Sequence, residues 1–177
     1  MYAKLLSPAK QSLSDKVLVD STIFIDYDRY CEVAISWWEE TVSSGVKIFL
    51  SEISLMEVYK GIARSSGSRG EKLAEFETRI TTMKKERKIH RILPINSSVF
   101  QKARELLKDY CLRHTPPQCR GRMEALICDM LIAATALLKS LPVVTLNDKD
   151  FEWIKSHGLQ VIKPYDPEDC RYKDCRS

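Results

Sequence analysis

The sequence has few of the residues that build the commonest metal and disulfide sites. Its three histidines, His90, His114 and His157, are scattered without the spacing of a catalytic triad or a zinc site, and we interpret them as structural or surface residues. No CxxC pair occurs among the cysteines, so free thiols are expected rather than a disulfide framework. The six cysteines are Cys31, Cys111, Cys119, Cys128, Cys170 and Cys175.

Long apolar runs are also absent. None approaches the roughly 20 residues that span a bilayer, and residues 1–16 have neither a sustained apolar core nor a cleavage-site pattern. We therefore predict a cytoplasmic protein without a membrane partner. With 177 residues, 44% of them hydrophobic and 29% charged, the chain has the size and composition of one folded domain. We expect a domain over 16–164, an N-terminal extension over 1–15 and a C-terminal tail over 165–177.

Several motifs that would announce other chemistries are missing. The sequence contains no GxxxxGK[ST], no GxGxxG and no GxSxG, which argues against P-loop enzymes, dinucleotide-binding domains and α/β-hydrolases. A phosphoacceptor receiver domain would need adjacent acids after its first strand, and the Asp20-Ser21 pair does not supply them.

Short apolar runs alternate with segments of helical periodicity, which is typical of a layered α/β fold with a mostly parallel sheet and helices on both faces. Pro94 favours an edge position for the third strand, and Ser97 or Ser98 is expected to cap the helix that follows it. The predicted strands are 16–21, 46–50, 91–95, 142–146 and 159–164. The predicted helices are 22–42 (as two short helices), 53–65, 71–88, 97–113, 122–139 and 150–157.

Four acidic residues stand at or after strand ends: Asp20, Glu57, Asp129 and Asp150. Each alone has an ordinary interpretation as a helix cap, an exposed helical residue or a turn residue. Together they predict a shared cleft, because ligands of open parallel sheets gather outside the carboxyl ends of the strands. Carboxylates in one cleft repel each other unless cations neutralise them, and oxygen ligands suit Mg²⁺ or Mn²⁺. Such a site can activate water and orient a phosphodiester.

Four segments in this order, VLVDSTIFID, SEISLMEVYKG, CDMLIAATAL and VVTLNDKDF, resemble the motifs of the PIN-domain family over roughly residues 16–164. The likeness is greatest to the VapC-type toxins of prokaryotic toxin–antitoxin pairs. It implies a three-layer PIN-like fold, a homodimer, and ribonuclease activity that depends on Mg²⁺ or Mn²⁺.

The resemblance also implies roles for individual residues. Asp20, Glu57 and Asp129 fall on the family's acidic metal ligands, and Asp150 is preferred as the fourth catalytic and metal-binding acid. Asn147 is the polar assistant of Asp150, and Asp148 lies outside the set. Two hydroxyl residues, Ser21 and Thr145, are expected to assist the acids.

The leading hypothesis is therefore an endoribonuclease toxin that a cognate antitoxin silences. The alternatives are a stand-alone PIN nuclease that processes RNA and a non-catalytic module that binds RNA or protein. With 28 basic against 24 acidic residues, the composition permits an RNA partner without requiring one. The candidates for guiding the RNA backbone are Lys84, Lys85, Arg87, Lys88, Arg120 and Arg122.

Overall fold

The computed structural model describes residues 14–65, 67–113 and 123–169, with the backbone alone described for 123–125. Five residues named above, His114, Cys119, Arg120, Arg122 and Cys170, lie outside the described ranges, as do Cys175 and most of the predicted N-terminal extension. None of the described helices is long and apolar enough to cross a membrane.

Five parallel strands form one sheet in the order β3-β2-β1-β4-β5. The predicted parallel sheet is thus confirmed, and β3 occupies the edge that Pro94 favoured. The chain builds outward from β1 through β2 to β3, then returns to the other side of β1 as β4. The strands are β1 (Lys16–Val19), β2 (Lys47–Ser51), β3 (Arg91–Leu93), β4 (Val143–Val144) and β5 (Val161–Ile162).

Helices fill the connections between strands, close to the ranges that the sequence predicted. Ser51 caps α3, its Oγ accepting from the Ile53 amide at 3.2 Å. At α5 the predicted cap, Ser97 or Ser98, was wrong. The cap is Asn96, whose side-chain oxygen accepts from the Val99 amide at 3.1 Å, because the helix already begins at Ser97. The helices are α1 (Ser21–Asp28), α2 (Glu32–Ser43), α3 (Glu52–Arg64), α4 (Arg69–Lys85), α5 (Ser97–Arg113), α7 (Met123–Lys139) and α8 (Asp148–Phe151), with 3₁₀ turns η1 (Glu152–His157) and η2 (Pro167–Asp169).

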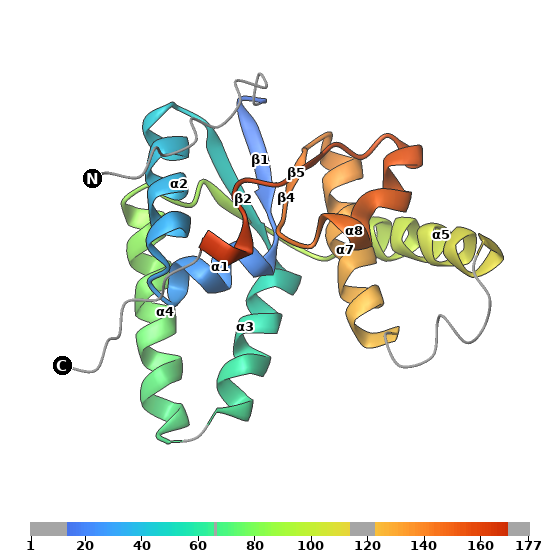
Figure 1. Ribbon diagram of the computed structural model, residues 1–177. Helices are drawn as coiled ribbons and strands as arrows, with labels where there is room; N and C mark the ends of the chain where they lie inside the picture. The colour runs from blue at the N-terminus through green and yellow to red at the C-terminus, as the bar shows by residue number, and fades with distance from the viewer. Residues whose placement is uncertain (1–13, 66, 114–122, 170–177) are drawn as a thin grey trace.

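A separate hydrophobic core lies on each face of the sheet. Because strand side chains alternate between faces, Val17 and Val19 of β1 join one core while Leu18 joins the other. The first core packs α1, α2, α3 and α4 against the sheet, and the second packs α5, α7 and α8. Figure 1 shows these two groups of helices on opposite sides of the strands. The result is the predicted three-layer α/β fold.

The cysteines correct one expectation. Cys111 and Cys128 remain thiols, as predicted, but Cys31 is fully buried and disulfide-bonded. Spacing along the chain does not reveal which sulfur atoms approach within bonding range in the fold, so the sequence alone could not single out Cys31.

Candidate functional site

Asp20 occupies the place where the sheet reverses its direction of growth. β1 ends at Val19, and the next residue, Asp20, leads into α1. β1 pairs here with its neighbour β4. Ligands of open parallel sheets bind at such a switch point, outside the carboxyl ends of the strands. The side chain is only 2% exposed, so its charge must be compensated by the protein itself.

Four hydrogen bonds hold the Asp20 carboxylate. Its Oδ1 accepts from the backbone amide of Ser21 at 2.7 Å and from the Ser21 hydroxyl at 3.2 Å. Its Oδ2 accepts from the hydroxyl of Thr22 at 2.9 Å and from that of Thr145 at 2.8 Å. Asp20 therefore both caps α1 and lies at the proposed site, so the two interpretations of this residue do not exclude each other.

The two threonine hydroxyls are oriented by the backbone that follows β4. Thr22 Oγ1 accepts from the amide of Leu146 at 3.2 Å, and Thr145 Oγ1 accepts from the amide of Asn147 at 2.9 Å. Since an amide can only donate, each hydroxyl proton is left to point at Asp20. The sequence analysis included Thr145 but missed Thr22, whose signal is a hydroxyl two residues after a capping aspartate.

Glu57 of α3 lies beside Asp20, and the Ser21 hydroxyl lies between the two acids. Burial raises the pKa of Glu57 above its usual value of 4.5, and the negative charge of Asp20 raises it further. A hydrogen bond from Ser21 and the positive charge of Lys60 oppose that rise. Because a hydroxyl carries one proton, Ser21 can donate to only one of the two carboxylates at a time. The repulsion between the carboxylates of Asp20 and Glu57 is therefore only partly relieved.

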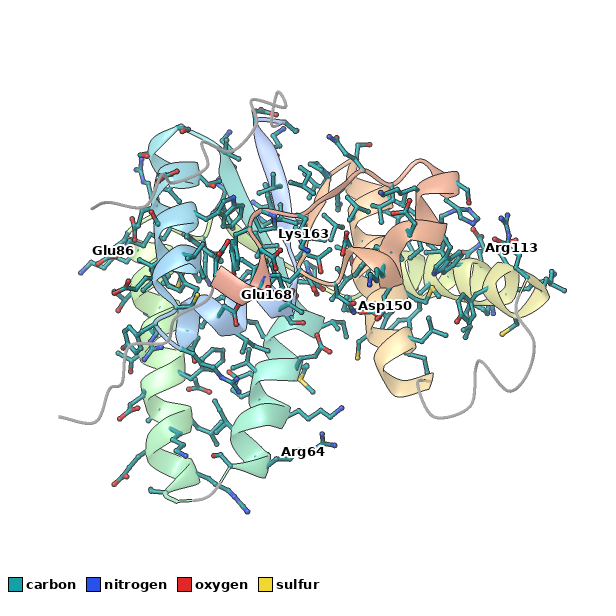
Figure 2. The ribbon with its side chains drawn as sticks, viewed as in Figure 1. Arg64, Glu86, Arg113, Asp150, Lys163 and Glu168 are labelled. Carbon is teal, nitrogen blue, oxygen red and sulfur yellow. The ribbon has the colours of Figure 1, made fainter. Side chains whose placement is uncertain are left out.

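The turn after β4 organises Asp150. The Asn147 side-chain amide donates to Asp150 Oδ2 at 2.5 Å, and the Asp150 amide donates to the Asn147 carbonyl at 3.1 Å. Figure 2 shows Asp150 at α8, next to α7. This contact agrees with a supporting role of Asn147 toward Asp150.

Asp129 lies on α7 and, like Asp150, is partly buried. Among the side chains of the described residues, no three histidine, cysteine, aspartate or glutamate groups lie close enough to hold one metal ion. The structure therefore brings together two of the four predicted acids, Asp20 and Glu57, with three hydroxyls around them. A role of Asp129 or Asp150 at this pair stays a prediction.

Of the six basic residues that were predicted to guide RNA, Arg120 and Arg122 lie outside the described ranges, and the other four lie away from the acidic pair. Lys84, Lys85 and Arg87 are exposed at the end of α4, just before β3 begins, whereas the acidic pair follows the ends of strands. In a parallel sheet, residues that precede the strands and residues that follow them lie at opposite ends of the strands. Lys88 is also engaged, with its Nζ at 2.9 Å from Glu39 and 3.3 Å from Glu86.

The fold and the motif order agree with a known family. The PIN domain matches residues 17–156, which is most of the chain. The chain belongs to the PIN-domain family. Its acidic pair thus lies at the switch point of a PIN sheet, and the resemblance drawn from the four sequence segments is confirmed.

Solved structures of other PIN proteins share this fold. A toxin–antitoxin complex from Klebsiella pneumoniae has 23% identity and a TM-score of 0.55, and the match covers 85% of this chain and 98% of that one. FitAcB from Neisseria gonorrhoeae has 19% identity, a TM-score of 0.60 and coverage of 84% and 97%. VapBC2 from Rickettsia felis, bound to promoter DNA, has 16% identity, a TM-score of 0.61 and coverage of 83% and 97%. No curated protein matches the sequence.

Proposed function

We propose that this PIN protein is an endoribonuclease that depends on Mg²⁺ or Mn²⁺ and acts as the toxin of a toxin–antitoxin pair. The observation that carries the proposal is the pairing of Asp20 with Glu57 at the switch point of a parallel sheet. Two carboxylates in a partly buried place are unfavourable by themselves, so the arrangement is better suited to binding a cation than to stabilising the fold.

The donor chemistry of the site fits a hard divalent cation. Carboxylate and hydroxyl oxygens surround the place where Asp20, Ser21 and Glu57 meet. Mg²⁺ commonly takes one or two carboxylates from a protein and completes its shell with waters and substrate phosphates. Asp20 and Glu57 would hold the ion, and Asp129 and Asp150 are proposed to complete the site. When bound, such an ion supplies charge stabilisation for the phosphodiester and activation of water.

The surrounding residues would fix the geometry of hydrolysis. Thr22 and Thr145 restrict the rotation of Asp20, since both hydroxyls donate to the same oxygen of its carboxylate. Asn147 restrains Asp150 in the same way, so that Asp150 can accept a proton from the attacking water. In the reaction one bond forms between water oxygen and phosphorus, the bond to the leaving oxygen breaks, and that oxygen takes up a proton. Preorganised oxygen donors of this kind lower the barrier because little rearrangement is needed.

The first test replaces Asp129 by asparagine. We expect the loss of at least about 100-fold in Mg²⁺-dependent RNA cleavage, because even residues that only support metal ligands cost 10–100-fold when changed. Asp148→Asn is the matched control, since it neutralises an acid that we place outside the site, and it should cleave as the parent does. A fully active Asp129→Asn variant, or a parent enzyme that is equally active in EDTA, would refute the mechanism.

The proposed toxin role rests on the resemblance of the sequence motifs to those of VapC-type toxins, and on similar solved structures described as toxin–antitoxin complexes. Expression of the chain in a bacterial host should arrest growth, and co-expression of the product of a neighbouring gene should relieve the arrest. Growth arrest that needs Asp129 but has no protein to relieve it would favour a stand-alone RNA-processing nuclease. A homodimer is also proposed, and the mass of the purified chain in solution tests it.

A further inference from the structure

One face of α3 joins the acidic pair to two basic side chains. Ile53, Glu57, Lys60 and Arg64 follow at spacings of four, three and four residues. At about 100° per residue they fall within about 60° of one another around the helix. We call these four residues the α3 stripe.

The packing of α3 shows where the stripe points. Leu55, Val58 and Ile62, on the other side of the helix, pack into the core that also contains Phe76 of α4. Ile53, the first residue of the stripe, packs instead against the core built by α5, α7 and α8. The stripe therefore faces away from α4. Figure 2 shows Arg64 on this side of α3, near the far end of the helix.

The charges along the α3 stripe change from acidic to basic. Lys60 is close enough for its positive charge to oppose the rise in the pKa of Glu57. Arg64 is exposed and makes no ion pair with any residue in the described ranges. It lies about 10 Å farther along the helix than Glu57, at about 1.5 Å per residue. Between the two, no atom of the described residues lies within 4 Å of the position that a Cβ of Gly61 would take, and Gly61 is exposed.

RNA needs such a surface next to a pair of carboxylates. Its phosphates are repelled by Asp20 and Glu57, and basic side chains nearby offset that repulsion and attract the backbone. The other acid of α3, Glu52, is engaged by the backbone amide of Ile95 at 3.0 Å. The basic cluster at the end of α4 is too far from the acidic pair to have this role, because it lies at the other end of the strands.

We propose that Lys60 and Arg64 of the α3 stripe bind successive phosphates of single-stranded RNA and lead its backbone to Asp20 and Glu57. This inference rests on the proposed function and adds to it the path of the substrate. The two side chains are positioning residues rather than catalytic ones, since they would contact only the backbone away from the bond that breaks.

The experiment measures binding without cleavage. Full-length protein and a labelled oligouridylate are mixed in EDTA, and the dissociation constant is measured over a range of salt concentrations. The test variant is Lys60→Gln with Arg64→Gln. The control is Arg104→Gln with Lys108→Gln on α5, an exposed Arg and Lys pair at the same four-residue spacing. Glutamine has nearly the helix propensity of either residue, so all variants should fold.

We expect the slope of log Kd against log salt to be lower by about 1.4 in the test variant than in the parent. Two phosphate contacts are lost, and each contributes roughly 0.7 to the slope for a single strand. The control should keep the parent slope. A test variant with the parent slope would overturn the inference, even if the parent cleaves RNA with Mg²⁺ and the proposed function stands. If the parent neither binds nor cleaves RNA, both proposals fall. Arg64→Gln alone, about two turns from Glu57, should lower the slope by half as much.

Discussion

An almost fully buried carboxylate must replace the hydration that it loses, and Asp20 does so with four hydrogen bonds from three residues. This has a consequence for mutagenesis at the residue scale. Asparagine at position 20, even with its carbonyl toward the Ser21 amide, would place an NH₂ group where the Thr22 and Thr145 hydroxyls now donate. Those hydroxyl protons would lose their acceptor, and an unsatisfied buried group costs about 1–3 kcal/mol. Asp20→Asn therefore confuses loss of function with loss of stability. Asp129 and Glu57, which are less buried, are the better positions for testing activity.

Glu57→Gln should increase stability at neutral pH while removing activity. The folded-state pKa of Glu57 is raised above 4.5, chiefly by burial and then by the Asp20 charge. Its contribution to stability is therefore fully present below pH 4.5 and is lost as the pH rises through the folded-state pKa. Glutamine cannot ionise, so the Glu57→Gln variant keeps this stability as the pH rises. Urea unfolding at several pH values from 4 upward measures it as the difference between the two proteins.

Glu75→Gln of α4, an exposed glutamate, is the control for the change from Glu to Gln. If the parent and Glu57→Gln lose stability in parallel as the pH rises, the burial of Glu57 does not have the effect that we describe.

Ser54 of α3 and Ser51, which caps that helix, should respond in opposite ways to alanine. Ser54 is fully buried, and its hydroxyl has no hydrogen-bond partner among the described residues, so removing the oxygen should stabilise the protein by about 1 kcal/mol. Ser51 is equally buried but caps the helix through Ile53, and Ser51→Ala should destabilise it by about 1 kcal/mol. Urea unfolding with an unchanged m-value would report both changes. A loss of stability in Ser54→Ala would mean that its hydroxyl makes a contact in solution.

At the scale of elements, hydrophobic periodicity predicted the strands and helices well where each has one dominant environment. β1 and β2 are short apolar runs because both of their faces are covered, and α3 follows directly from the cap at Ser51. The ends were less predictable. β4 and β5 have two residues each, although longer apolar runs suggested more, because ladder hydrogen bonds depend on neighbouring strands as well as on side chains.

The α7 helix shows a second limit. Ile127 and Leu138 are 43% and 46% exposed although both are large and apolar, while Ile132 and Ala133 are fully buried. The middle of the helix is covered on several sides by α5, α8 and the sheet, so a single apolar stripe does not describe it. Which face Asp129 presents thus depended on packing that a helical wheel does not contain.

The site itself was predictable in its residue types and not in its contacts. Position at or after a strand end singled out both Asp20 and Glu57, and the family resemblance agreed, yet the Ser21 hydroxyl between them is a contact across two elements. Likewise, the sequence did not reveal that the four basic residues before β3 lie at the other end of the strands from the acidic pair, because a run of charge does not say which end of the strands it reaches.

At the scale of the whole molecule, the acidic pair joins parts of the chain that fold around both faces of the sheet. Asp20 is bonded to Thr145, far along the chain, and α3 contacts both cores through Val58 and Ile53. A ligand that binds this pair therefore bridges β1, β4 and α3. Binding that occurs only in the folded state stabilises the whole domain.

Mn²⁺ should accordingly raise the thermal unfolding temperature of the full chain. At 100 times its dissociation constant a single bound ion contributes about 2.7 kcal/mol, which for a domain of this size is about 5–10 °C. Glu57→Gln and Asp129→Asn should lose most of that shift, because each removes a proposed ligand charge. Asp148→Asn should retain it, and EDTA should reverse it. Shifts of equal size in all four proteins would indicate ions bound elsewhere, and no shift in any of them would favour a PIN module that binds RNA or protein without catalysing cleavage.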